Sequence, residues 1–411
     1  MSLALLRNAP DAVERLRSEH DGWVIGDRAL SASAMVARLQ SVLPVLGITR
    51  VGRLTGLDRI GIPVWMACRP NAANLSVSQG KATSDDAAAI SAIMESVELA
   101  MAERPHPRSF LTSRLSLGVH ALRDIASRRY LRMRADEPSA SSEQRWVWGW
   151  DLLTATHVAV PAEIVELRDI PTTTYWQTSD GLAAGATLTE AVVHGICELI
   201  ERDAAGLHSF RTRAEMLSRE VDPRSWGVIA TLERRIANAG LRLRLFDITT
   251  DLEIPAYLAV LVPMDRHRRL TYLDLPSGSG AHPKAAKAAE RAVLEAVQTR
   301  LTTISGARDD ISPNDYDRPL PPALEFYLDE HPRPPNAQAP TVVPSSAPAM
   351  LGWLLDRIRA RDAGPVVLVS LESEDLGFTT VRMLAPGLEQ DPGTRNRRLG
   401  HRAIAAMLGD R

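Results

Sequence analysis

Apolar residues recur at helical spacing in three stretches of the chain, and polar side chains interrupt each stretch at the same interval. Residues three and four positions apart lie on one face of an α-helix. Each stretch therefore predicts a helix with a short row of polar groups among apolar neighbours. We call these rows the polar ladders, and their members are Ser91, Glu95 and Glu98; His194, Glu198 and Glu201; and Arg291, Glu295 and Gln298.

Start and stop signals bound the three ladder helices. The first is predicted to begin after Ser84, a favourable N-cap, and to stop before Pro105, because the residue preceding a proline avoids the helical conformation. The second begins with the capping-box pattern of residues 187–190 and runs to about residue 205. The third begins at Pro283 and ends at Gly306.

Other apolar runs predict the rest of the fold. Extended runs indicate strands at residues 46–54, 60–67, 75–79, 147–152, 157–161, 241–248, 254–263, 269–275, 366–371 and 379–384. Helical spacing indicates further helices at residues 11–18, 31–43, 349–361 and 397–408. Glycine or proline content predicts loops at residues 179–185, 277–283 and 313–348. The mixture predicts an α/β or α+β fold.

A length of 411 residues favours several subdomains. We predict an N-terminal helical segment at residues 1–45, a catalytic domain at 46–390 and a C-terminal helix or tail at 391–411. The net charge of −2 provides no basic field for nucleic acid. No apolar run is long enough to span a membrane, no signal peptide is recognised, and the two cysteines suit a reducing cytoplasm.

The polar ladders suggest one shared ligand. Acidic residues on a helix are usually solvated, but here they stand among apolar residues and the pattern occurs three times. Mg²⁺ prefers oxygen ligands and is commonly shared between carboxylates and phosphates. Lys81, Arg202 and Arg291 would neutralise the phosphates. We therefore expect a nucleotide with its magnesium ions, and His194 is left open between a ligand contact and a buried polar group.

Other candidate chemistry is weaker. The ten histidines form no zinc-binding pattern. Gly278-x-Gly280 precedes a helix but lacks the Lys-Ser/Thr ending of a phosphate loop. Cys68 and Cys197 are interpreted as structural cysteines, and the tryptophans of Trp148–Trp150 as packing residues.

Several motifs, in the same order along the chain, resemble the YcaO family. They cover residues 46 to 390 and comprise Thr55–Val64, Leu75–Lys81, the three polar ladders, Asp180–Gly185, Gly280–Pro283, Glu295–Leu301 and Ser305–Asp310. The resemblance implies a YcaO-like fold in which three helices surround ATP and Mg²⁺. It also implies an enzyme that phosphorylates the oxygen of a peptide backbone amide, commonly as a homodimer.

The resemblance carries roles to individual positions. Metal binding is implied for Glu95, Glu98, Glu198 and Glu201. Contacts to the nucleotide or to metal-bound water are implied for Lys81, Ser91, Glu190, Arg202, Arg291, Glu295, Gln298 and Arg308. The sequence departs from the usual family pattern at Ala82, Leu99, Asp180 and Ala186.

The sequence most resembles YcaO members that act with a TfuA partner, a branch associated with thioamide formation from a sulfur donor. No proline follows Pro392, whereas azoline-forming members often end in a proline-rich tail. Thioamide formation in a ribosomal peptide or protein is therefore the first hypothesis. The alternatives are an azoline-forming cyclodehydratase acting on Cys, Ser or Thr, and a non-catalytic peptide-binding scaffold.

Overall fold

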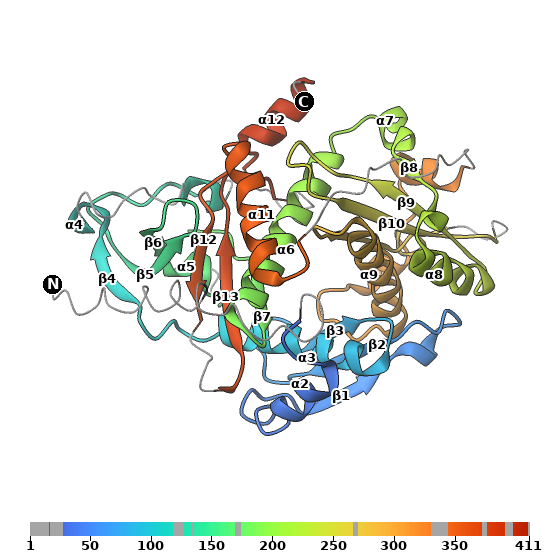
Figure 1. The fold of residues 1–411 in the computed structure, drawn as a ribbon, viewed down its shortest axis with the longest axis horizontal. Helices are drawn as coiled ribbons and strands as arrows, with labels where there is room; N and C mark the ends of the chain where they lie inside the picture. The colour runs from blue at the N-terminus through green and yellow to red at the C-terminus, as the bar shows by residue number, and fades with distance from the viewer. Residues whose placement is uncertain are drawn as a thin grey trace.

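A computed structural model describes residues 16, 28–117, 127–132, 135–168, 174–265, 270–329, 344–371, 376–390 and 398–409. In these ranges three antiparallel sheets are packed with long helices, and the prediction of a mixed α/β fold is confirmed (Figure 1). No helix within the described ranges has the length and apolar content needed to cross a membrane.

The described strands form three sheets. The first has the order β1-β2-β3, at Arg50–Arg53, Val64–Cys68 and Val77–Lys81. The second has the order β11-β10-β9-β8, at Ser277–Ala281, Ala256–Pro263, Leu241–Asp247 and Glu220–Val221. The third has the order β4-β5-β12-β13-β7, with β6 beside β5, at Phe110–Ser113, Glu143–Asp151, Val367–Ser370, Thr379–Leu384, Leu182–Gly185 and Thr156–Pro161.

The polar ladders lie on the three longest described helices, which are α3 at Asp85–Ala102, α6 at Leu188–His208 and α9 at Ala285–Ser305. The other α-helices are α2 at Ala32–Leu39, α4 at Arg114–Leu117, α5 at Ala162–Val165, α7 at Arg213–Ser218, α8 at Gly227–Asn238, α10 at Pro313–Tyr316, α11 at Ala347–Ala360 and α12 at His401–Leu408. The Ser84 side chain caps α3, and Gly306 ends α9 in the left-handed conformation, both as predicted.

Each ladder helix packs on the strand that precedes it in the chain, α3 on β3, α6 on β7 and α9 on β11. At glycines of β3 and β11 the helix backbone lies so close that no side chain would fit. A Cβ at Gly280 would lie 2.6 Å from the backbone nitrogen of Ala292, and one at Gly80 would overlap the α3 backbone at Ala88 and Ala92. The alanines of α3 and α9 therefore serve to bring helix and strand backbones into contact.

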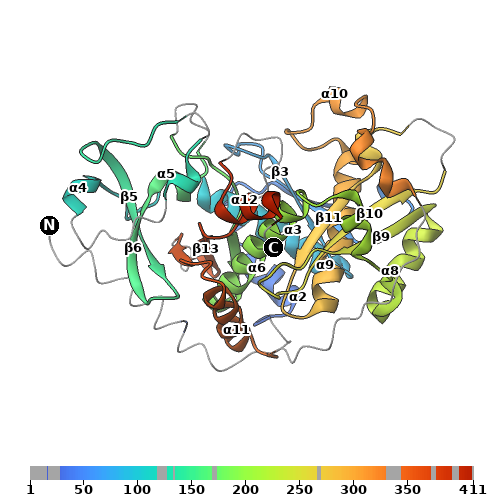
Figure 2. The same cartoon turned by 90° about the horizontal axis from the view of Figure 1, so that it is seen from above.

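The three strand–helix units close into a ring. α3 also contacts β7, α6 contacts β11, and α9 contacts β3, so each helix bridges its own strand and the strand of the next unit. Figures 1 and 2 show these three helices as neighbours in the middle of the molecule. This closure brings together ladders that lie about 100 residues apart in the sequence.

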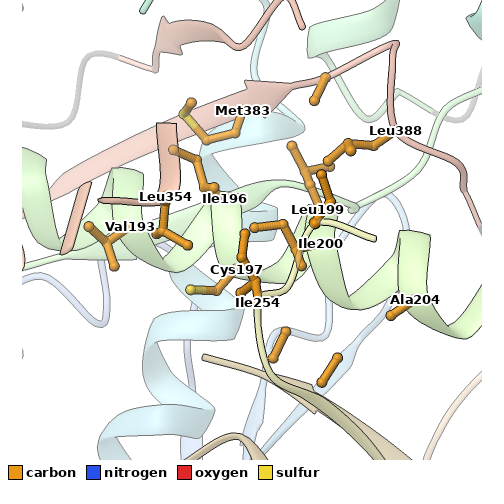
Figure 3. Close-up of a cluster of buried hydrophobic side chains, with 14 of the residues drawn as sticks. Val193, Ile196, Cys197, Leu199, Ile200, Ala204, Ile254, Leu354, Met383 and Leu388 are labelled. Carbon is orange, nitrogen blue, oxygen red and sulfur yellow. The ribbon is translucent and has the colours of Figure 1, made fainter. Parts of the chain in front are cut away.

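Apolar residues of α6 anchor that helix in the core. Figure 3 shows them packing against Leu354 of α11, Met383 of β13, Ile254 and Leu388. Cys197 is buried in this cluster, as predicted, whereas Cys68 is half-buried at the end of β2. The rigid attachment of α6 to two other elements fixes the direction in which its ladder points.

Two predicted loops are strands. Residues 182–185 form β7, which pairs with β13, and residues 277–281 form β11, which pairs with β10. Apart from Leu182, both strands consist of small residues that look loop-like in sequence, and at Gly185, Gly278 and Gly280 a helix lies too close for a side chain. As a result Pro283 is not the first helical residue, and α9 begins at Ala285.

Two further predictions need correction. Within residues 269–275 the described part forms a 3₁₀ turn at Tyr272–Asp274, because Thr271 and Asp274 cap each other. The alternation of leucine and arginine at residues 241–245 predicts a half-exposed strand, but β9 is mostly buried, because Arg244 forms an ion pair with Glu220 inside the fold. Most of the predicted helix at residues 11–18 lies outside the described residues. The same holds for residues 330–343 of the proline-rich loop. The described remainder of that loop contains α10 and a 3₁₀ turn at Pro322–Leu328. The strands predicted at residues 147–152 and 157–161 pair with each other as the antiparallel strands β5 and β6.

Candidate active site

The carboxylates of the three ladders lie close enough to influence one another. Burial raises the pKa of Glu98 well above its usual value, and Glu198 and Glu95 raise it further. Burial also raises the pKa of Glu295, where Lys81 opposes the effect and Glu201 adds to it. Carboxylates of α3, α6 and α9 thus repel one another electrostatically. The ring therefore brings ladder residues of all three helices into one site.

Backbone N–H groups hold three of these carboxylates. The N–H of Ala184 in β7 donates to Glu98 Oε1 over 2.8 Å. Glu95 accepts from the N–H of Gln79 in β3, and Glu295 accepts from the N–H of Ser279 in β11. Because the strands are fixed in sheets, the carboxylates are held in place before any ligand arrives.

The ladder of α6 carries its own cation. Arg202 lies 3.1 Å from Glu201, 3.5 Å from Glu198 and 3.3 Å from Asp180, measured between side-chain nitrogen and oxygen. Burial raises the pKa of Glu198 to about 7 although Arg202 opposes it, and Asp180 and Glu201 raise it further. The Ser279 hydroxyl lies 2.8 Å from Glu201 and ties α6 to β11.

Two more predicted cations face the carboxylates. Lys81, at the end of β3, lowers the pKa values of Glu95 and Glu295 against the larger effect of burial. Arg308 donates to Asp310 over 2.9 Å, and its positive charge also lowers the pKa of Glu95. The neighbouring Asp309 accepts from the N–H of Ser76 over 2.9 Å, which anchors the Arg308 loop beside the β3 end.

Arg291 contacts the first residue of the α6 ladder and a backbone carbonyl of β11. Its Nη2 lies 2.6 Å from His194 Nδ1, and its Nη1 donates to the Ala281 carbonyl over 3.2 Å. The first residues of the α6 and α9 ladders therefore contact each other. His194 is a polar partner of Arg291 in this structure.

The remaining predicted residues lie at the edges of the site. Ser91 is half-buried on α3. The Glu190 N–H donates to Thr187 Oγ1 over 3.2 Å at the start of α6, but the Glu190 carboxylate faces Arg28 and the Ala29 N–H. Only half of the predicted capping box therefore forms.

Two amide side chains fit a polar ligand. Gln298 Oε1 and Gln79 Nε2 are buried without a hydrogen-bond partner, although the Thr302 hydroxyl donates to Gln79 Oε1. A buried polar atom without a partner is unfavourable unless a ligand or water satisfies it. These two atoms lie on the α9 ladder and on β3, beside the coupled carboxylates, so the residues present fit a ligand rich in donors and acceptors.

Within the described residues, no group of three or more His, Cys, Asp or Glu side chains is arranged to hold a metal ion by itself. Mg²⁺ is usually held by one or two carboxylates together with waters and substrate phosphates. The ladders therefore suit an ion shared with a phosphate-bearing ligand. The individual metal and nucleotide roles of the ladder residues stay predictions.

Sequence reasoning missed several residues of this site. Asp180 departs from the usual family motif, yet it pairs with Arg202. Gln79 lies in the motif Leu75–Lys81 and Ser279 within Gly278-x-Gly280, but their contacts depend on the sheet register. Buried Arg382 on β13 lowers the pKa of Glu198, and Arg28 pairs with Glu190. Neither arginine lies in a recognisable pattern, because each is brought in from another part of the chain.

Comparison with known proteins identifies the class. The family model described as YcaO cyclodehydratase, ATP- and Mg²⁺-binding, matches residues 79–389. The chain belongs to the YcaO family, and the predictions of family, ATP and Mg²⁺ are confirmed at this level. An uncharacterised protein from the tfuA 3′ region of Rhizobium leguminosarum bv. trifolii is 36% identical over 397 residues, covering 93% of both chains.

Solved structures share the fold. YcaO from Methanopyrus kandleri, bound with AMPPCP and Mg²⁺, matches with a TM-score of 0.71 and 22% identity over 92% of this chain and 97% of that one. A heterocyclase in complex with substrate and cofactor matches with a TM-score of 0.76 and 20% identity over 98% of this chain. The present chain spans 58% of that heterocyclase.

Proposed function

We propose that this protein activates a peptide backbone amide by transferring the γ-phosphoryl group of ATP to the amide oxygen, and that the product is a thioamide. The observation that carries the proposal is the ring of coupled carboxylates, in which Glu98 on α3 and Glu198 on α6 both have raised pKa values. Such a cluster is unfavourable alone and is matched by divalent cations that bind phosphates.

The chemistry explains why such a site is needed. An amide is a poor electrophile because resonance gives its C–N bond partial double-bond character. In the proposed reaction a hydrosulfide ion adds to the amide carbon, and the oxygen, now negative, takes the phosphoryl group and releases ADP. The C–O bond then breaks, phosphate leaves, a proton is lost, and a C=S bond remains. Phosphoryl transfer depends mainly on positioning and charge neutralisation.

The residues of this chain would divide that work. Glu95, Glu98, Glu198 and Glu201 would hold the magnesium ions, which neutralise phosphate charge when bound. Arg202 keeps Glu198 and Glu201 oriented through the contacts described above. Lys81 and Arg308, which both lower the pKa of Glu95, would balance the remaining negative charge.

The relative from the tfuA 3′ region supports the thioamide outcome and a TfuA-like partner, because it is similar to this chain over almost its full length. The description of the family as cyclodehydratases supports azoline formation as the second candidate. A sulfur donor, a homodimer and a cytoplasmic location belong to the same proposal. Size-exclusion chromatography with light scattering would test the dimer.

The decisive experiment combines the protein with ATP, Mg²⁺, sulfide, its candidate partner and a candidate peptide, followed by mass spectrometry. A thioamide makes the peptide heavier by the difference between sulfur and oxygen, whereas an azoline makes it lighter by one water. Glu198→Ala should abolish either change. Full activity in that variant would disprove the role of Glu198, and an unchanged peptide mass under all conditions would count against the enzyme proposal.

A further inference from the structure

The C-terminal helix α12 is tied to α6 at the second residue after the α6 ladder. Arg402 of α12 donates to both carboxylate oxygens of Asp203, over 2.8 Å from Nε to Oδ1 and over 2.9 Å from Nη2 to Oδ2. Asp203 directly follows Arg202 in the sequence, and α12 packs on α6 (Figure 1). The side chains of Asp203 and Arg402 are 0% and 9% exposed, so this ion pair lies inside the fold.

A second segment holds the same carboxylate. The backbone N–H of Glu389 donates to Asp203 Oδ1 over 2.7 Å. The buried Glu389 carboxylate in turn accepts from the N–H groups of Gly400 and Ala403 at the start of α12, over 2.8 Å and 3.4 Å. Asp203, Glu389 and Arg402 therefore form a closed set of hydrogen bonds between α6 and α12. A guanidinium that binds both oxygens of a carboxylate fixes orientation as well as distance.

This network acts on the part of α6 that carries the end of the ladder. Glu201 and Arg202 precede Asp203 in the same helical turn, so a shift or rotation of this turn moves all three residues together. The apolar side of α6 packs in the core, and the Ser279 hydroxyl donates to Glu201. The Arg402 contact fixes the helix at a further point. Ligand-binding side chains need such support, because they must stay within about 0.5 Å of their working positions.

Helix α12 lies outside the part of the chain to which the sequence and the family comparison assign the site. The α6 ladder and the cation that follows it end at Arg202, and residues 391–411 are predicted to form a separate helix or tail. The family model ends at residue 389. The structure nevertheless joins α12 to the ladder helix through two buried charged side chains.

We propose that Arg402 is a positioning residue of the nucleotide site. By holding Asp203 it fixes the last turn of the α6 ladder, where Glu201 is to share Mg²⁺ with the phosphates and Arg202 is to orient the carboxylates. Arg402 acts through Asp203 and not by contact with the nucleotide, so α12 is part of the framework of the active site. This inference rests on the proposed function, since it takes Mg²⁺-ATP as the ligand.

The test measures how much Mg²⁺ the site needs. A fixed concentration of the fluorescent analogue mant-AMPPNP is titrated with Mg²⁺ in the presence of the full chain. Arg402→Lys keeps the charge but cannot bind both oxygens of Asp203 in the same way. It should raise the Mg²⁺ concentration for half-maximal binding about ten- to a hundredfold, as for the loss of other groups that orient metal ligands. Excess Mg²⁺ should restore binding, which a merely structural role of Arg402 would not produce.

Arg244→Lys is the matched control. Arg244 and Glu220 form another buried ion pair with two hydrogen bonds, and their side chains are 1% and 2% exposed, but this pair joins β9 to β8. The variant should lower the urea midpoint, as Arg402→Lys does, and leave the Mg²⁺ requirement within about twofold of the wild type. Asp251→Asn is a second control, because it removes the 46% exposed partner of Arg402 and leaves Asp203 in place. Its Mg²⁺ requirement should also stay within about twofold.

Asp203→Asn provides an independent variant if Arg402→Lys proves poorly folded by circular dichroism. It keeps an acceptor for the Glu389 N–H and removes the charge that binds Arg402, so the same rise in the Mg²⁺ requirement is expected. An unchanged requirement in either folded variant would overturn the role of Arg402 and leave the proposed function intact. The same holds for a loss of binding that excess Mg²⁺ does not restore. Absence of mant-AMPPNP binding by the wild type would overturn the proposed function and this inference together.

Discussion

The backbone N–H of Ala184 donates to Glu98 Oε1 over 2.8 Å, so a strand of the six-stranded sheet holds a carboxylate of a helix from another unit. The same kind of link recurs around the ring. Ser279 of β11 donates to Glu201 of α6, and the hydroxyl of Thr302 on α9 donates to Gln79 of β3. The bonds that close the ring therefore also orient the polar groups of the site.

The first prediction concerns Glu98. Glu98→Gln keeps the side-chain size and a group that can accept from Ala184, but it removes the charge. We expect Mg²⁺-dependent nucleotide binding to weaken by about a hundredfold, because a full ligand charge is lost in a buried setting. Titration with ADP in the presence and absence of Mg²⁺ would measure this. Equal loss without Mg²⁺ would show that Glu98 does not act through the metal.

The second prediction concerns pH. Burial raises the pKa of Glu198 to about 7, whereas an unfolded glutamate has a pKa near 4.5. Between these values the folded protein holds a proton that the unfolded chain releases, so this group's contribution to stability is greatest below pH 4.5 and is lost as pH rises through about 7. The loss is of the order of 3 kcal/mol.

Urea unfolding without Mg²⁺ at pH 5 and pH 8 would measure this loss, with Glu198→Gln as the control. The free energy of unfolding of the wild type should fall relative to the variant between the two pH values. Mg²⁺ with ADP should restore the wild type at pH 8, and at about pH 6, where Glu198 is still largely protonated, binding should release protons. A difference that is the same at both pH values would rule out a titrating Glu198.

The sequence predicts those parts of the site that depend on local spacing along one helix. It does not predict the parts that depend on contacts between separate elements. The ladders lie on single helices, so local spacing was sufficient to find Glu95, Glu98, Glu198 and Glu201. The partners of those residues depend on sheet register and ring closure. Ala184 and Ser279 therefore could not be assigned to their carboxylates from spacing alone.

The errors in the fold have a related cause. The glycines in and around residues 182–185 and 277–281 predict loops, because glycine is depleted in strands. In the structure a helix backbone lies against each strand, and larger side chains would not fit. The tertiary contact therefore overrides the local preference. Helix boundaries fared better, since Ser84 and Gly306 act through local hydrogen bonds and backbone conformation.

The third prediction tests this close packing. Gly80→Ala would place a methyl group against the α3 backbone at Ala88 and Ala92. Backbone atoms cannot move aside as a flexible side chain can, so we expect a loss of about 3 kcal/mol or more in stability. Thermal unfolding followed by circular dichroism would measure it. Gly352→Ala in α11 is the control, because an added Cβ there meets nothing within 4 Å and should stabilise the helix by about 0.5–1 kcal/mol.

The fourth prediction separates stability from binding at Gln298. Its Oε1 is buried without a partner in the ligand-free protein, which is unfavourable by about 1–3 kcal/mol. Gln298→Leu has a similar volume and removes that polar atom. The variant should therefore be more stable than the wild type without ligand, yet bind Mg²⁺-ATP more weakly, because the ligand loses a partner.

Urea unfolding of both proteins with and without Mg²⁺-AMPPNP would measure the two effects together. We expect the ligand to stabilise the wild type more than Gln298→Leu, so that the order of stability reverses at saturating ligand. Thr303→Val, also on α9, is a suitable control, because the Thr303 hydroxyl donates only to the Thr299 carbonyl of its own helix. If Gln298→Leu were destabilised without ligand and bound Mg²⁺-AMPPNP normally, Gln298 would be a packing residue and not a nucleotide contact.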